Sequence, residues 1–288
     1  MNEPKQYLAL CLDPVHVGTG GYQLGRVDMS IVREPATGIP KVPGTSLAGA
    51  IRAYAEQAKE EDASLPDIDT VFGTSEGEKG KQGMVRFFDM QVVLFPVNSH
   101  LGTVWVSTAE RLLVWTKLFS GVGKKDWPKG PQDEDKFIPL NGLESGKPLQ
   151  LGWLLLEADA AKVTDVGEVL PQTLTFVKKV AMVSDKMFYH LVNDHLEVRT
   201  SVSIDRETGA AKPGALFTYE AIPRGTVLGF EVAIDERRSG GVGVEDVNKL
   251  LRKAYRVLKL LGIGGMGTRG FGRLEVLCND NNGGMPVD

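Results

Sequence analysis

The strongest constraint on the fold is a strand–helix–strand pattern near the C-terminal end of the chain. Residues 227–234 and 271–277 are apolar runs that each predict a strand. Between them, residues 244–261 place apolar side chains on one side of a predicted helix: Val247, Leu250, Leu251, Ala254, Leu258 and Leu261. A helix with such a stripe must be covered by a sheet or by another helix, so this segment predicts half of a layered domain.

The same pattern occurs near the N-terminal end. Residues 6–12 predict a first strand, and residues 84–95 predict one long strand or a pair. Residues 45–59 predict a helix, which Thr45 or Ser46 can cap. Two such units form an antiparallel sheet backed by two helices, so the predicted fold is α+β and RRM-like, which is the ferredoxin-like arrangement.

We expect a single domain, residues 1–288, whose core consists of about 5–96 and 226–278. The intervening residues 97–225 are predicted to be a large insertion. It ends in a polar hairpin, residues 196–218, in which Gly209 suits the left-handed position of the turn.

Two helices and a strand are predicted inside the insertion. Thr108 is a typical N-cap for a helix through residue 119, and Ser184 is a typical N-cap for a helix over residues 185–192. Residues 151–157 predict a strand.

Composition limits the function classes. The formal net charge of −4 argues against a stand-alone nucleic-acid binder, although less strongly against one subunit of an assembly. The two cysteines and four histidines show no metal-site spacing. The sequence has no run of 18 apolar residues and no signal-peptide pattern at its start, so we expect no membrane association and a cytoplasmic location.

The most unusual segment is the glycine-rich stretch 262–272. Dinucleotide and Walker sites need a strand, a loop and then a helix, whereas here a helix precedes the loop. Backbone N–H groups together with Arg269 and Arg273 could hold a polynucleotide backbone. A sharp turn that needs glycine for close packing explains the stretch equally well.

Asp28 and His16 lie in the long connection between the first strand and the first helix. Connections of this length in compact domains are uncommon and tend to be functional. By themselves these residues do not indicate catalysis, since most loop aspartates are solvated. The nearby Ser46 is not in a GxSxG pattern, so it is read as part of a helix start whose N–H groups could hold a phosphate.

Several motifs in this order resemble those of one family. They are the segment from His16 to Gly20, the helix start Pro43-Gly-Thr-Ser-Leu-Ala-Gly-Ala-Ile-Arg52, Val71-Phe-Gly73 and the loop from Gly264 to Gly272. Together they resemble the RAMP superfamily of CRISPR proteins. Gly83-Met-Val-Arg-Phe-Phe-Asp, Leu94-Phe-Pro-Val97, Ile204-Asp-Arg-Glu-Thr-Gly209 and Ala215-Leu-Phe-Thr-Tyr-Glu220 are similar to the backbone (fourth) subunits of type III-B (Cmr) effector complexes.

This resemblance implies a fold with palm, fingers and thumb, in which the hairpin 196–218 is the thumb. It implies copies that stack along a crRNA as a filament, with other Cmr subunits, and that cut complementary target RNA at six-nucleotide intervals. The cutting carboxylate falls on Asp28, either as a base or as a ligand of Mg²⁺ or Mn²⁺. Possible supporting residues are His16, Tyr219 and Glu220. Expected RNA contacts are Arg26, Ser46, Arg52, Arg199, Arg206, Gly265, Thr268 and Arg269.

Two other functions stay open at this point. One is a filament subunit of a type III complex that binds RNA without cutting it. The other is a metabolic enzyme that binds a nucleotide at the glycine-rich loop.

Overall fold

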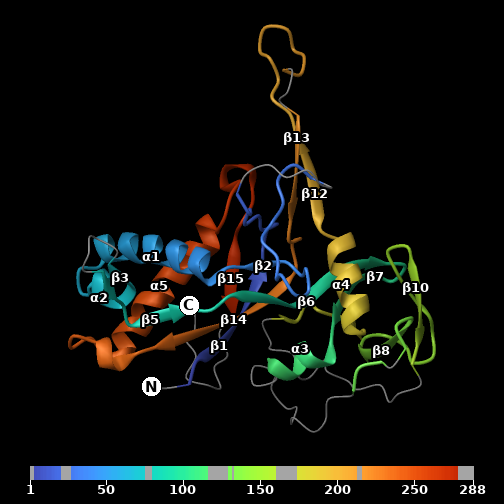
Figure 1. The fold of residues 1–288 in the computed structure, drawn as a ribbon, viewed down its shortest axis with the longest axis horizontal. Coiled ribbons are helices and arrows are strands. Elements are labelled where there is room, and N and C mark those ends of the chain that lie inside the picture. The colour runs from blue at the N-terminus through green and yellow to red at the C-terminus, as the bar shows by residue number, and fades with distance from the viewer. Residues whose placement is uncertain are drawn as a thin grey trace.

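The computed structural model describes residues 3–20, 27–74, 80–115, 129–131, 133–159, 174–212 and 216–277. Its body is a large sheet with helices packed on it, and one hairpin stands away from this body (Figure 1). No helix among these residues is long and apolar enough to cross a membrane.

One part of the sheet joins strands from the two ends of the chain. Its order is β15 (Leu274–Leu277), β1 (Lys5–Cys11), β14 (Val227–Ile234) and β6 (Met90–Ser99), and every neighbouring pair is antiparallel. The short strand β5 (Val85–Phe87) continues the β6 edge along β14. The predicted strand 84–95 is therefore a pair.

Helices α1 (Gly44–Glu61) and α5 (Val244–Leu261) pack against each other and cover one face of these strands (Figure 1). The burial of alternate residues explains why β1 is apolar from Tyr7 to Cys11. Tyr7 and Ala9 join the core beneath the helices, whereas Leu8 joins a second core on the opposite face. Both faces of the strand are buried, which accounts for an apolar run without alternation.

Strand β6 continues into a second part of the sheet. This part consists of β7 (Gly102–Ser107), β11 (Val180–Met182), β8 (Lys136–Asn141), β10 (Leu154–Ala158) and β9 (Leu149–Leu151). Strand β9 pairs back onto β6 through Ser99 and Leu151, so the six strands close into a barrel-like sheet. The prediction of an α+β fold is confirmed only as a sheet-dominated mixture of strands and helices, and the closed sheet was not expected. Residues 97–225 share a strand with the core, and the expected boundary at residue 96 falls within β6.

The remaining elements are short. They are β2 (Lys41–Val42), α2 (Ile68–Phe72), β3 (Gly73–Thr74), β4 (Lys81–Gln82), α3 (Ala109–Val114), α4 (Asp185–Asp194) and the 3₁₀ turns η4 (Glu236–Arg238) and η5 (Gly267–Arg269). Thr108 and Ser184 cap α3 and α4 as predicted.

The start of α1 differs from the prediction. Its N-cap is Pro43, and neither Thr45 nor Ser46 caps it. Instead the Gly44 N–H donates to the Asp89 carboxylate at 2.7 Å. A residue that precedes β6 thus supplies the cap, which a local sequence pattern does not reveal.

The hairpin expected to be the thumb, called the thumb hairpin below, consists of β12 (Glu197–Ser201) and β13 (Phe217–Ala221), which form a two-stranded sheet separate from the large one. Its outer end projects far from the body (Figure 1). The Asp205 carboxylate accepts the backbone N–H groups of Glu207 and Thr208 in the turn, and Gly209 has a φ of 67°. The turn therefore has the left-handed glycine that the sequence predicts.

Candidate functional site

The connection after β1 folds back along the inner end of the thumb hairpin. Met29 pairs with Tyr219 of β13, because the Met29 N–H donates to the Thr218 carbonyl and the Glu220 N–H donates to the Met29 carbonyl. Gly18 pairs with Ile31 within the same connection. These bonds place residues 27–33, the Asp28 loop, against β13.

The Asp28 carboxylate is half-buried and held by a single threonine. Its Oδ2 accepts the Thr218 N–H at 2.6 Å and the Thr218 hydroxyl at 2.9 Å, and the Asp28 N–H donates to that hydroxyl at 3.1 Å. The backbone N–H of Thr218 first, and then its hydroxyl, lower the pKa of Asp28 below its ordinary value. Asp28 is thus not the freely solvated loop carboxylate that its sequence position suggests.

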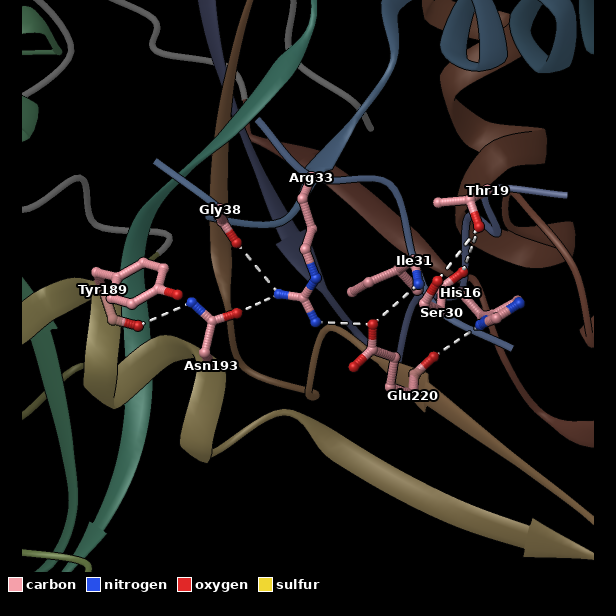
Figure 2. Close-up of polar contacts among 9 residues, drawn as sticks. All are labelled: His16, Thr19, Ser30, Ile31, Arg33, Gly38, Tyr189, Asn193 and Glu220. Atoms are coloured by element: carbon pink, nitrogen blue, oxygen red, sulfur yellow. Dashed lines mark hydrogen bonds and ion pairs between the residues drawn. The ribbon is translucent and has the colours of Figure 1, made fainter. Parts of the chain in front are cut away.

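Glu220 lies close by with its carboxylate buried. Its Oε1 accepts the Ile31 N–H at 3.0 Å and an Arg33 N–H at 2.7 Å (Figure 2). The side chain of Glu220 is therefore occupied by the loop and by an ion pair. It supports the Asp28 loop and is a poor candidate for accepting a proton from substrate.

His16 is buried against the same strand. Its Nδ1 donates to the Glu220 carbonyl at 2.7 Å, since a carbonyl oxygen only accepts (Figure 2). In a neutral imidazole this bond leaves Nε2 as an acceptor. The ring is tightly enclosed, because a Cβ on Gly18 would lie 3.0 Å from Nε2, and Tyr219 packs edge-on against the ring.

An aromatic–arginine cluster lies at the inner end of the thumb hairpin. Its members are Phe217, Tyr219, Phe271, Arg199 and Arg269. The Arg199 guanidinium lies 4.5 Å from the centre of the Phe271 ring, and that of Arg269 lies 5.3 Å from the centre of the Phe217 ring. Exposed guanidinium groups stacked on aromatic rings are suited to contacts with bases and phosphates.

The glycine-rich loop lies beside this cluster. Gly264 has a φ of 85°, and a Cβ on it would lie 2.3 Å from the His16 carbonyl oxygen. Gly272 has a φ of 98°, and its carbonyl accepts the Ile263 N–H. Close packing therefore explains why glycine occupies these two positions. Met266 has a φ of 67° and is the one non-glycine with positive φ among the described residues.

The other predicted contacts are scattered. Gly265 and Thr268 are exposed in the loop, and Arg206 is exposed in the turn of the thumb hairpin. Ser46 is half-buried in the first turn of α1. Arg26 lies outside the described residues.

Arg52 has a structural role in this fold. Its guanidinium donates to the carboxylates of Glu56 and Asp69 and to the Gly73 carbonyl. These bonds join α1 to α2 and β3, so Arg52 belongs to the packing of these helices and is unlike the exposed arginines of the cluster.

A divalent ion would find few protein ligands here. The described part of the chain contains no group of three His, Cys, Asp or Glu side chains that could hold a metal ion. Thr218 binds Oδ2 of Asp28, so a ligand would approach this carboxylate through Oδ1. Mg²⁺ commonly binds through one or two carboxylates, substrate phosphates and water, so a lone aspartate is compatible with such an ion.

Sequence reasoning missed three residues that organise this region: Thr218, Arg33 and Asn193. The sequence contains a signal for one of them, Arg33. Glu220 stands in an apolar stretch of β13, and a buried carboxylate needs a cation. Arg33 lies 187 residues from Glu220 in the sequence, so no local pattern identifies it as the cation that pairs with Glu220.

The chain is similar in sequence to CRISPR proteins from other organisms. The endoribonuclease Cmr4 of a CRISPR Cmr system from Pyrococcus furiosus is 27% identical over 95% of both chains. The endoribonuclease Csm3 of Methanothermobacter thermautotrophicus is 21% identical, over 92% of this chain and 80% of that protein.

Solved structures share the fold. A type III-B Cmr-beta complex bound to cognate target RNA contains a chain with a TM-score of 0.70 and 18% identity, covering 96% of both chains. A crystal structure of oligomeric Cmr4 from Pyrococcus furiosus gives a TM-score of 0.61 and 20% identity, covering 96% of this chain and 99% of that one. The family model of the RAMP superfamily matches residues 9–275, and the chain therefore belongs to the RAMP superfamily.

Proposed function

We propose that the chain is a backbone subunit of a type III-B CRISPR effector complex, which binds crRNA and complementary target RNA and cuts the target. The observation that carries the proposal is the Asp28 carboxylate, fixed by Thr218 at the inner end of the thumb hairpin beside the aromatic–arginine cluster. The names and lengths of the matched relatives support it. Its partners would be the two RNAs, further copies of itself and other Cmr subunits, in the cytoplasm.

The strand order supports a ferredoxin-like core within this larger fold. Strands β1 and β6 flank β14 and are connected through α1, whereas β14 and β15 flank β1 and are connected through α5. Two interleaved β-α-β units of this kind are the ferredoxin-like pattern. We infer that these elements are the palm, with the closed six-stranded sheet attached to it through β6.

The proposed RNA surface includes the aromatic–arginine cluster and two further arginines. Arg273 forms an ion pair with Asp13, and its hydrogen bond is the main reason for the lowered pKa of Asp13, to which the charges of Arg224 and Arg199 add. Four arginines thus gather around the inner end of the thumb hairpin in a protein whose net charge is −4. Two of them are ion-paired, Arg273 with Asp13 and Arg199 with Glu197, but a cluster of arginines can still attract phosphates to one surface of an acidic chain.

The proposed reaction is attack by a ribose 2′-hydroxyl on its own phosphate, which gives a 2′,3′-cyclic phosphate and a 5′-hydroxyl end. The thumb hairpin would splay the RNA so that nucleophile, phosphorus and leaving oxygen align. Asp28 would orient the 2′-hydroxyl or receive its proton through Oδ1, because Oδ2 is bonded to Thr218. Mg²⁺ or Mn²⁺, held by Asp28 and phosphate oxygens, would supply stabilisation of the developing negative charge.

The experiment is target-RNA cleavage by the reconstituted complex carrying Asp28→Asn. This change keeps the size of the side chain but removes its charge and basicity. We expect a loss on the order of 10²-fold or more in cleavage rate, with unchanged crRNA and target affinity. The matched control is Asp133→Asn, an exposed aspartate before β8, which should cut at the normal rate.

Near-normal cleavage by Asp28→Asn would assign cutting to another residue or subunit and leave this chain as an RNA-binding backbone subunit. Loss of RNA binding together with cleavage would give Asp28 a structural role. Binding of ATP or NAD by the purified chain would instead favour a metabolic enzyme.

A further inference from the structure

A network of polar contacts joins three segments behind the Asp28 loop. Arg33, the last residue of that loop, lies at its centre (Figure 2). Its guanidinium donates to Glu220 on β13, to the Gly38 carbonyl in the following loop and to the Asn193 side chain on α4. One side chain therefore connects the Asp28 loop, the thumb hairpin and a helix.

Two of the three acceptors, the side chains of Glu220 and Asn193, are themselves held in place. Glu220 is buried, and its Oε1 also accepts the Ile31 N–H at 3.0 Å. Asn193 donates its side-chain N–H to the Tyr189 carbonyl at 2.9 Å, so that its oxygen faces Arg33 (Figure 2). A planar guanidinium between fixed acceptors has little freedom, and it fixes the relative positions of the segments that carry them.

The network holds both strands of the thumb hairpin. Thr218 and Glu220 are alternate residues of β13, and they bind opposite ends of the Asp28 loop. Two residues separate the end of α4 from the start of β12, so the bond from Arg33 to Asn193 links the loop to the start of that strand. Thr218 and Met29 attach the loop to β13, and the position of this pair of segments relative to α4 and the start of β12 therefore depends on Arg33.

We propose that Arg33 is a positioning residue that sets which phosphate is cut, a role that rests on the proposed function. The thumb hairpin would choose the nucleotide, and Arg33 would hold Asp28 and β13 in a constant position relative to α4 and the start of β12. Without Arg33 the Asp28 loop keeps its bonds to Thr218 but loses its connection to α4. Cleavage then slows and spreads to neighbouring phosphates, whereas RNA binding persists.

The first variant is Arg33→Lys, which keeps the charge next to Glu220 but cannot reach three separated acceptors in one plane. The second is the double variant Arg33→Met with Glu220→Gln. It leaves no unpaired buried charge, and the glutamine oxygen still accepts the Ile31 N–H. The matched control is Arg252→Lys, whose ion pair with Glu245 lies at the surface of α5.

The assay is single-turnover cleavage of end-labelled target RNA by the reconstituted complex, with cuts mapped to the nucleotide. We expect both Arg33 variants to cut 10- to 100-fold more slowly, roughly the effect of a misplacement near 1 Å, and at more than one phosphate per site. Titration should give unchanged RNA affinity, and Arg252→Lys should behave as the unaltered protein does. A folded double variant that cuts at the normal rate and positions would overturn the proposal, as would loss of RNA binding.

A second readout separates this proposal from the proposed function. Backbone hydrogen exchange of Met29 and Ile31 in the unaltered complex should be slow, and it should accelerate in Arg33→Lys while β1 and β14 stay protected. If Asp28→Asn cuts normally, the proposed function fails whatever Arg33 does. If exchange of these two amides is unchanged in Arg33→Lys, the positioning role fails even where Asp28 is required for cutting.

Discussion

The environment of Asp28 depends on one neighbouring residue. Thr218 offers its N–H and its hydroxyl to the same carboxylate oxygen. Both bonds stabilise the ionised form and lower the pKa of Asp28. An aspartate of this kind is a weak base, which favours orientation of the nucleophile or binding of a cation over wholesale proton abstraction.

The lowered pKa of Asp28 predicts the acid side of the pH–rate profile. Activity that needs the carboxylate is present above the folded-state pKa and is lost as pH falls through it. Since that pKa lies below the ordinary aspartate value of about 3.9, we expect no loss of cleavage from Asp28 between pH 8 and pH 5. Thr218→Val should raise the pH at which cleavage begins to fall. Single-turnover rates across this range test the prediction, and an inflection near pH 6 in the unaltered protein would contradict it.

At the scale of the elements, a glycine of β14 leaves room for the tryptophan that follows α3. Trp115, which ends α3, is buried with its ring against Gly229 of β14. A Cβ on Gly229 would lie 2.5 Å from the ring. The helix therefore packs flat on the sheet only because this strand has a residue without a side chain.

Adding a methyl group at Gly229 should lower the stability of the protein. We expect Gly229→Ala to reduce the free energy of unfolding by about 1–3 kcal/mol through overpacking. Trp115→Ala should reduce it by about 3–5 kcal/mol by leaving a cavity. Gly49→Ala, on an open side of α1, is the control and should be neutral or stabilising. Urea denaturation measures all three, and equal effects of the two glycine changes would refute the steric explanation.

The thumb hairpin can be tested as a unit. Residues 202–212 are largely exposed and add little to the core, so replacing 202–213 by a short turn should leave the melting temperature nearly unchanged. The regular spacing of the cuts should be lost. Unchanged six-nucleotide spacing in the shortened protein would mean that another part of the complex selects the nucleotide.

Local patterns predicted the elements well where the signal lies within a few residues. The bounds of α5 and β14 agree with the apolar periodicity, and Thr108 and Ser184 cap their helices. The cap of α1 by Asp89 and the closure of the barrel through Ser99 and Leu151 depend on distant parts of the chain. Such pairings have no local signature, which is also why Arg33 was missed.

At the scale of the whole molecule, charge is unevenly distributed. The chain carries 37 acidic and 33 basic residues, yet four arginines gather at the inner end of the thumb hairpin. We expect RNA phosphates to contact these arginines, because a cluster of cations attracts a polyanion even on a chain of net negative charge.

This distribution predicts how RNA binding depends on salt. Affinity for RNA should fall linearly with the logarithm of the salt concentration. Arg199→Gln should weaken binding and reduce the slope by about one, as expected for a lost phosphate contact. Arg252→Gln, on the surface of α5, should change neither. Titrations at several salt concentrations measure both quantities, and an unaltered slope in Arg199→Gln would place the RNA backbone elsewhere.

The position of β1 has a consequence for synthesis on the ribosome. The first strand to be made lies between β14 and β15, the last two. All six strands of the barrel-like sheet are complete by residue 182, so this part can fold while the nascent chain is still growing. Strand β1 stays without partners until translation is nearly finished. A ribosome that stops early would therefore release a half-formed protein with an apolar strand open to aggregation.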